Sequence, residues 1–239
     1  MACKYCKIFT FKEKLIARKE KIPYVSRGGL KIEIAFEEFG LSAVGKKAAD
    51  VGASTGGFTD FLLKNGASSV ITIDVGYGIL AWELRNSPKV TVLERTNIRY
   101  LDPGRIPHLA DFTVVDVSFI SIKTIFKKIL DITGSSGEIL LLVKPQFEVK
   151  KEEVENRGII KSAELHYKVL KELAEFTAGF PVEIKGITFS KIKGTKGNIE
   201  YWMYLKKNLD KKTLKDEKSI LNYDKIINKV VKSSHNFFN

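Results

Sequence analysis

The chain has 239 residues, 44% of them hydrophobic, which is enough to bury one substantial core. No apolar run approaches the roughly 18 residues needed to span a bilayer, and the N-terminus lacks the pattern of a secretory leader. We therefore expect a cytoplasmic globular protein with one main domain and no membrane association.

The net charge of +12 is concentrated at the two ends of the chain. Residues 1–31 hold nine Lys/Arg against two acids, and residues 206–239 hold nine Lys against four acids. Residues 32–205 balance, with 22 basic and 22 acidic side chains. Basic flanks suit a polyanion such as RNA, because each phosphate contact releases counterions. A lysine tail that only keeps the protein in solution explains 206–239 equally well.

Apolar runs alternate with helical patterns along most of the chain, which predicts an α/β fold with a largely parallel sheet covered on both faces. Predicted helices are 29–39, 58–64, 78–86, 121–131 and 162–177. Predicted strands are 48–51, 70–75, 90–93, 112–117, 138–144, 182–189 and 198–205. No helix separates the last two strands, so a hairpin and an antiparallel final strand are expected.

Asp50 to Phe58, with the sequence DVGASTGGF, form a glycine-rich turn between a strand and a helix. Such a turn brings backbone N–H groups close to a ligand. The spacing favours a nucleoside that carries a carboxylate, and S-adenosylmethionine is the obvious candidate. A tight turn needed only for packing is the alternative. Asp74 closes the next strand, where a carboxylate can accept both hydroxyls of a ribose, although an acid that caps a helix gives the same pattern.

Four charged residues fall at predicted strand ends, within a strand or at a helix start. Asp116 and Lys144 close apolar strands, Glu200 lies within the last strand, and Lys31 opens the first helix. Charged groups in such positions need partners of opposite sign. Each alone is more typical of a structural role, but together at one sheet edge they indicate a site. Segment 145–160 is long, charged and without periodicity, and is either a loop that covers this site or a plain surface excursion.

Several motifs occur in order between about residues 23 and 205. They are YVSRGGLK at 24–31, the glycine loop, DVSFIS at 116–121, VKPQFE at 143–148 and GNIE at 197–200. In these motifs the chain resembles the TlyA family, also called hemolysin A proteins, which belongs with the FtsJ-like ribosomal RNA methyltransferases. The resemblance implies a Rossmann-like class I methyltransferase with a seven-stranded, mostly parallel sheet and an antiparallel last strand.

The resemblance also implies an activity and a set of catalytic residues. The expected reaction is S-adenosylmethionine-dependent 2′-O-methylation of ribose, with a cytidine target, in ribosomal RNA or ribosomal subunits. The Lys-Asp-Lys-Glu set of the family corresponds to Lys31, Asp116, Lys144 and Glu200. Lys144 is the expected general base, and Lys31 is the neighbouring cation that favours its neutral form and positions the 2′-oxygen. Asp116 and Glu200 would orient the two lysines.

Further residues are expected to bind the donor and the RNA. Donor contacts are predicted at Gly52, Ala53, Ser54, Gly56, Gly57 and Phe58 around the methionine end, Asp74 at the ribose, Val75 and Asn97 at the adenine, and Asp116. Asn97 has an ordinary turn residue as its alternative interpretation. RNA contacts are predicted at Arg27, Lys31, Lys191 and Lys193. No metal is expected, because the Cys3/Cys6 pair has no second pair to complete a zinc site.

The chain also departs from the family pattern. Members usually begin with an S4 RNA-binding domain, which we expect to be absent or truncated here, leaving 1–23 as a basic arm. The methyltransferase domain would span 24–205, followed by a lysine-rich extension at 206–239. Lys191 stands where the family generally has proline, and Arg157 replaces the first glycine of a pair. Two other classes stay open: a pore-forming haemolysin, and a noncatalytic RNA-binding protein with the same fold.

Overall fold

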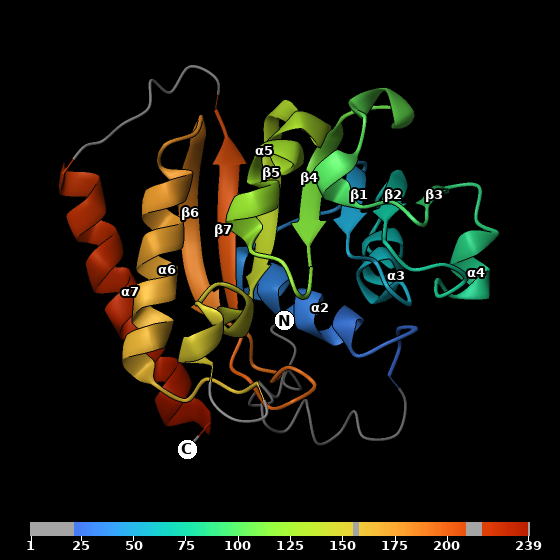
Figure 1. Cartoon of the computed structure of the whole chain (residues 1–239). Helices are drawn as coiled ribbons and strands as arrows, with labels where there is room; N and C mark the ends of the chain where they lie inside the picture. Colours follow the sequence, from blue (N-terminus) through green and yellow to red (C-terminus); the bar gives the residue numbers. More distant parts are fainter. Residues whose placement is uncertain (1–21, 155–157, 209–216, 239) are drawn as a thin grey trace, which may run out of the picture.

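A seven-stranded sheet with the order β3-β2-β1-β4-β5-β7-β6 forms the centre of the protein (Figure 1). The structure, a computed structural model, describes residues 22–154, 158–208 and 217–238. The strands are β1 (Lys47–Val51), β2 (Ser69–Ile73), β3 (Val90–Leu93), β4 (Ala110–Val115), β5 (Thr133–Val143), β6 (Val182–Phe189) and β7 (Tyr201–Lys207). Strands β1 to β5 are parallel, and β7 is antiparallel to both β5 and β6. The predicted antiparallel final strand is thus confirmed.

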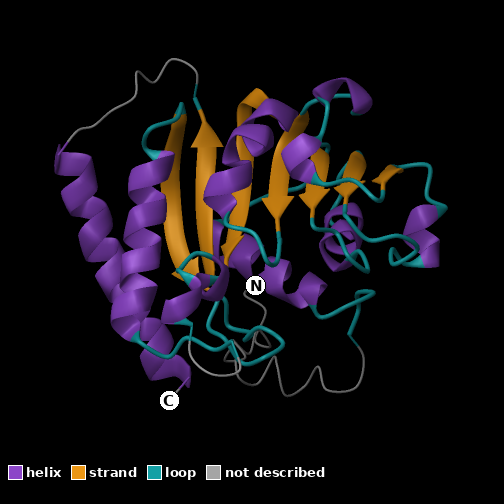
Figure 2. Cartoon of the chain, in the orientation of Figure 1, coloured by secondary structure: helices purple, strands orange, loops and turns teal. Residues whose placement is uncertain are grey.

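Helices cover both faces of the sheet (Figure 2). They are α2 (Gly28–Phe39), α3 (Gly57–Lys64), α4 (Trp82–Arg85), α5 (Ile122–Ile132), α6 (Ala163–Thr177) and α7 (Glu217–Phe238). Side chains of α2 and α3 share one buried cluster with the sheet, and those of α5, α6 and α7 share another. The two clusters lie on opposite faces because successive strand residues point to opposite sides.

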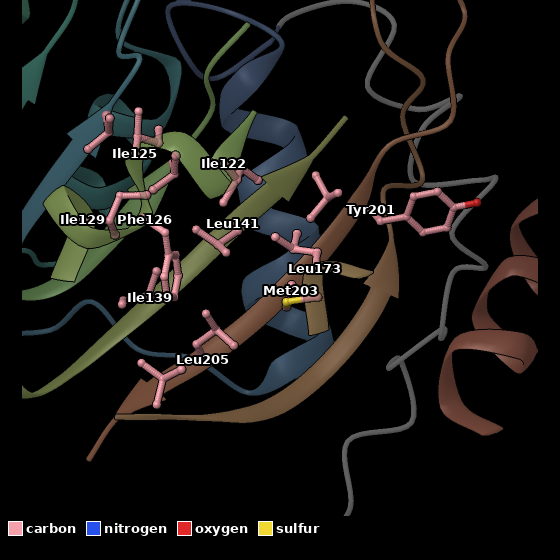
Figure 3. Close-up of a cluster of buried hydrophobic side chains, with 14 of the residues drawn as sticks. Ile122, Ile125, Phe126, Ile129, Ile139, Leu141, Leu173, Tyr201, Met203 and Leu205 are labelled. Carbon is pink, nitrogen blue, oxygen red and sulfur yellow. The ribbon is translucent and has the colours of Figure 1, made fainter. Parts of the chain in front are cut away.

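The larger cluster lies under α5 and α6 (Figure 3). Helix α5 presents Ile122, Phe126 and Ile129 at helical spacing, and all three are fully buried. They pack towards Leu141 of β5 and Met203 of β7, as Figure 3 shows. Burial of this many branched apolar side chains fixes the register of the sheet and so fixes the positions of the strand ends.

Helix α7 was not predicted from the sequence, and it occupies part of the lysine-rich extension. It packs against α6 and β6, with Ile227 and Val231 buried. The Tyr201 hydroxyl lies 2.9 Å from both Ser234 Oγ on α7 and His166 Nδ1 on α6. Burial lowers the pKa of His166 to about 4, so the imidazole is neutral at neutral pH. No helix in the described ranges combines the length and hydropathy of a bilayer span.

The segments that follow β1, β2, β4 and β5 leave the sheet at one edge, where the β6–β7 connection also lies (Figure 1). Parallel strands place their carboxyl ends together, which is where ligands bind in folds of this type. Strand β7 begins at Tyr201, three residues later than predicted, because its pairing with β5 starts there. Glu200 therefore lies directly before the strand and not within it.

Candidate active site

A cavity of about 390 Å³ opens at the carboxyl ends of β1, β2 and β4. Its lining combines polar residues with an apolar wall. The lining residues are Val51, Gly52, Ser54, Ile73, Asp74, Val75, Thr96, Asn97, Ile98, Asp116, Val117, Ser118, Phe119 and Ile120. An apolar slot with a few placed polar groups suits an adenosyl ligand, so we call it the donor cavity.

Gly52 allows two strand ends to approach closely at the floor of the donor cavity. Its φ of +85° is in the left-handed region, and a Cβ there would lie 2.2 Å from the carbonyl oxygen of Asp116. Only glycine fits both conditions. The turn that follows also brings Ser54 into a left-handed conformation with φ +51°.

The carboxylate of Asp74 organises the rim of the donor cavity. Its Oδ2 accepts a hydrogen bond from Ser54 N at 2.8 Å, and its Oδ1 accepts one from Gly76 N at 2.7 Å. Each oxygen keeps a further lone pair for a ligand. Asn97 also lies in the lining of the donor cavity. Its side-chain oxygen accepts a hydrogen bond from Arg99 N, so Asn97 also stabilises the local turn, which was its alternative interpretation.

Six of the ten predicted donor contacts line this cavity: Gly52, Ser54, Asp74, Val75, Asn97 and Asp116. Four are not part of its lining: Ala53, Gly56, Gly57 and Phe58. The Phe58 ring is buried and packs 5.8 Å from the ring of Trp202. Gly57 lies where a Cβ would meet Ser26 Oγ at 2.2 Å. Gly57 therefore allows close packing of α3 against the start of α2, whereas a Cβ on Gly56 would meet Leu84 at 2.3 Å. The contact of these four residues with a donor stays a prediction.

The four charged residues singled out in the sequence form two ion pairs. Lys144 Nζ lies 2.6 Å from Asp116 Oδ1 and also donates to Ser118 Oγ at 2.9 Å. Lys31 Nζ lies 2.6 Å from Glu200 Oε2, bridging α2 and the start of β7. The Lys144 side chain is 12% exposed and that of Glu200 is 4% exposed. Both pairs are therefore largely shielded from solvent, where charge interactions are strong.

Burial raises the pKa of the Glu200 carboxyl above its ordinary value, although the Lys31 ammonium opposes the shift. Asp116 and Lys144 also influence this carboxyl, so the two ion pairs act on each other electrostatically. Gly194 leaves the space that Glu200 needs, because a Cβ there would lie 2.4 Å from Glu200 Oε1. The β6–β7 connection is thus shaped around this carboxylate.

A second cavity, of about 340 Å³, adjoins the donor cavity and shares Ser118 and Phe119 with it. We call it the target cavity. Its other lining residues are Lys144, Gln146, Phe147, Val154, Gly158, Gly194, Thr195, Lys196, Asn198 and Glu200. Four of them, 146–158, belong to the long charged segment, which therefore lines a cavity in the residues that are described.

Phe119 stands at the boundary of the two cavities, and the sequence analysis gave it no role of its own. It is 87% exposed and has a left-handed φ of +64°, which is strained for an aromatic residue. Its ring lies 4.9 Å from that of Phe147. The exposed ring of Phe119, held against the partly buried ring of Phe147, offers a face on which a base can stack. Exposure and strain are tertiary properties, so no sequence signal marked Phe119.

Two predicted RNA contacts have partners within the protein. Lys191 Nζ lies 3.6 Å from the centre of the Phe189 ring and 3.8 Å from Glu38 Oε2. Lys193 Nζ lies 4.7 Å from the centre of the Phe238 ring at the end of α7. Lys191 Nζ also lies 5.7 Å from the centre of the Phe237 ring of α7, so both lysines contact the end of this helix from the β6–β7 connection. Arg27 is exposed, as an RNA contact requires.

Asp50 is a further group near the site that the sequence analysis did not single out. It is fully buried, and its Oδ2 accepts hydrogen bonds from Thr59 N at 3.0 Å and Thr59 Oγ1 at 2.7 Å. Burial raises its pKa to about 7, and the nearby Asp116 and Asp74 contribute to the rise. In the sequence, Asp50 stands in an apolar run just before the glycine loop, and this position could have marked it as a buried acid.

A mostly parallel seven-stranded sheet with an antiparallel β7 and a cavity at its carboxyl edge is the architecture of a Rossmann-like class I methyltransferase. The N-methyltransferase NodS from Bradyrhizobium japonicum shares this fold, with a TM-score of 0.52 at 12% identity over 76% of this chain and 94% of that one. At this identity the likeness concerns the fold alone.

Sequence comparison identifies the family. The model of the FtsJ-like methyltransferases matches residues 24–207, and the chain belongs to this family. It is 41% identical over 188 residues to the 16S/23S rRNA (cytidine-2′-O)-methyltransferase TlyA of Mycobacterium tuberculosis, covering 79% of this chain and 70% of TlyA. The structure of a candidate hemolysin from Streptococcus thermophilus superposes with a TM-score of 0.83 at 39% identity, covering 92% of this chain and 77% of that one.

Proposed function

We propose that this protein transfers a methyl group from S-adenosylmethionine to the 2′-hydroxyl of a cytidine ribose in ribosomal RNA. One observation carries the proposal: the Lys144–Asp116 ion pair joins the donor cavity, which Asp116 lines, to the target cavity, which Lys144 lines. A group that takes a proton at this boundary acts where the two substrates would meet. The named activity of the M. tuberculosis relative supports the same reaction.

The donor cavity suits S-adenosylmethionine in its chemistry. Gly52 and Ser54 would lie beside the methionine end, Asp74 would accept the ribose hydroxyls, and Val75 with Asn97 would face the adenine. Ala53, Gly56, Gly57 and Phe58 would support this loop. When bound, S-adenosylmethionine would supply an electrophilic methyl group, whose bond to the sulfonium sulfur breaks as the acceptor oxygen bonds to it, so that the neutral thioether is the leaving group.

Lys144 and Lys31 would have different roles toward the acceptor 2′-hydroxyl. Lys144 Nζ, in its neutral form, would take the proton of the 2′-hydroxyl while the oxygen forms its new bond to carbon. Lys31 would hold the oxygen in line, and its pairing with Glu200 limits where its ammonium can lie. Asp116 would orient Lys144, and Phe119 with Phe147 would stack the target base. Much of the acceleration would come from this alignment.

The RNA would reach the site along basic and exposed residues. Arg27 and Lys31 open helix α2 beside the catalytic groups and remain part of the proposed RNA contact. Residues 1–21 carry much of the positive charge but lie outside the described residues, so the proposed basic arm, the S4 domain and the boundary at residue 23 stay predictions. A cytoplasmic location, where ribosomal RNA is found, is part of the proposal.

Methyl transfer from labelled S-adenosylmethionine to purified ribosomal subunits tests the proposal, with nucleoside mass analysis to identify the product. We expect 2′-O-methylcytidine at a defined position, missing from ribosomal RNA of cells that lack the gene. Tight RNA binding without any transfer would contradict it and favour a noncatalytic RNA-binding protein. Leakage of liposomes without donor binding would contradict it in favour of a haemolysin.

A further inference from the structure

The charged side chains that line the target cavity are Lys144, Lys196 and Glu200. Lys144 Nζ lies 2.6 Å from Asp116 Oδ1, and Glu200 Oε2 lies 2.6 Å from Lys31 Nζ, so these four charges cancel in pairs. The side chain of Lys196 forms no ion pair or hydrogen bond with any residue that the structure describes. Among the described residues, the cavity wall thus carries one positive charge without a neutralising partner.

The Lys196 amine lies where a ligand in the target cavity can reach it. Lys196 is exposed, and its Nζ would lie 3.8 Å from a Cβ added to Gly158. Gly158 lines the same cavity, so the amine is directed along the cavity wall and not away from it. An unpaired ammonium beside a cavity of about 340 Å³ attracts an anionic group.

Hydrogen bonds hold the turn that carries Lys196 against the opposite wall of the cavity. Gly194 N donates to Asn198 O at 2.9 Å, which closes the turn. The Asn198 side chain donates to Gly158 O at 2.8 Å and accepts from Ile160 N at 2.9 Å. The backbone of the turn is therefore fixed relative to the cavity, and a ligand needs to order only the lysine side chain.

We propose that Lys196 binds a phosphate of the RNA backbone next to the ribose that is methylated. This inference rests on the proposed function, which places that ribose at Lys144. A ribose in RNA is bonded to a phosphate on each side, so a ribose in the target cavity brings a phosphate to the cavity wall. One phosphate carries one negative charge, which matches the single unneutralised charge of Lys196. An ammonium binds phosphate as a point charge and needs no fixed orientation.

Lys196 differs in this respect from the two other lysines of the β6–β7 connection. Lys191 and Lys193 lie against aromatic rings of the protein, at 3.6 Å and 4.7 Å from the ring centres. The sequence predicted an RNA contact for these two and not for Lys196, because the contacts of each amine are known only once the chain is folded. A phosphate contact positions the RNA and carries no sequence information. We therefore expect Lys196 to govern RNA affinity and not the choice of base.

Ethylation interference tests this inference directly. Ribosomal subunits are sparsely ethylated on their RNA phosphates, which removes the charge of each modified phosphate, and bound RNA is separated from unbound RNA. We expect ethylation of a phosphate that flanks the methylated ribose to exclude the RNA from the wild-type complex. This effect should vanish for Lys196→Gln, while interference at other positions persists. Lys196→Arg keeps the charge and should retain the effect.

Lys89→Gln is the matched control, because Lys89 is an exposed lysine directly before β3, at the opposite edge of the sheet. Both variants lose one positive charge, so only a local contact distinguishes them. Lys196→Gln should lower affinity for ribosomal RNA by roughly tenfold and reduce the slope of log affinity against log salt by about one phosphate contact. Lys89→Gln should behave as wild type. Donor affinity and thermal unfolding should match wild type for every variant.

The inference is overturned if the flanking phosphates interfere equally with wild type and Lys196→Gln, or if Lys89→Gln removes the effect as well. A signal lost only at phosphates distant from the methylated ribose also overturns it. If wild type transfers no methyl group to ribosomal RNA, the proposed function has failed and the inference fails with it. A wild type that methylates the RNA, yet binds it equally well when the flanking phosphates are ethylated, overturns the inference alone.

Discussion

Asp50, near the end of β1, is a buried acid with no cationic partner among the described residues, and its burial favours the protonated form. Burial raises its pKa from 3.8 to about 7. The folded state therefore holds this proton more tightly than the unfolded chain between those two pH values. Stability falls as the pH rises through this window, because the unfolded chain releases the proton more readily.

Asp50→Asn keeps an oxygen for Thr59 and removes the titration. We expect the free energy of unfolding of the variant to exceed that of wild type at about pH 8, by up to about 4 kcal/mol, and to differ little at about pH 4. Urea denaturation of both proteins at several pH values measures this difference. A difference that does not change with pH would contradict the assignment.

The position of Asp74 predicts how a substitution there changes affinity for the methyl donor. Asp74→Asn removes the charge that would bind the ribose hydroxyls, so we expect donor affinity to fall by roughly tenfold or more, since hydrogen bonds to charged groups contribute about 1.5 to 3 kcal/mol. Asp111→Asn is a matched control, because Asp111 accepts from Lys47 N at the opposite end of β1. Isothermal titration with S-adenosylmethionine decides the matter, and equal affinities would remove Asp74 from the donor site.

The sequence located charged residues at strand ends but not the partners they find there. Lys31 and Glu200 are 169 residues apart, and only the completed sheet brings them together. Phe119 lay within a quoted motif, yet its significance depends on its exposure and on its backbone strain. These are properties of the packed molecule and have no signature in residue type or spacing.

At the scale of elements, α7 shows where composition misled the analysis. The nine lysines in residues 206–239 were compatible with a solvated tail. In the structure, Ile227 and Val231 lie four residues apart and both are buried, so this face of α7 packs against the protein. The strands and the helices α2, α3, α5 and α6 were predictable because their apolar periodicity is strong. The helix predicted at 78–86 was largely wrong, because only Trp82–Arg85 is helical. The start of β7 was not predictable, because hydrogen bonding with β5 and β6 sets where the strand begins.

Helix α7 should contribute measurably to stability. Ile227→Ala removes a fully buried side chain between α7 and the core, and we expect a loss of about 2 to 5 kcal/mol in the free energy of unfolding. Lys229→Ala on the exposed face of the same helix should change it by less than about 0.5 kcal/mol. Urea denaturation compares the two. Equal effects would mean that α7 does not dock as described.

For the whole molecule, the proposed function makes a prediction about how RNA binding depends on charge. The net charge of +12 favours RNA of any sequence and predicts an affinity that falls steeply between about 50 mM and about 200 mM salt. Arg27→Ala should reduce the slope of log affinity against log salt by roughly one phosphate contact. Lys185→Ala, whose ammonium pairs with Glu183, should leave the slope unchanged. Filter binding to ribosomal RNA measures both, and equal slopes would exclude Arg27 from the interface.

The position of the Lys144 amine between the two cavities is the feature on which the proposed reaction depends. The most direct test measures methyl transfer and donor affinity together for wild type and Lys144→Ala. We predict that transfer falls at least about a hundredfold while the dissociation constant for S-adenosylmethionine stays within several-fold. Undiminished turnover by Lys144→Ala would contradict the account.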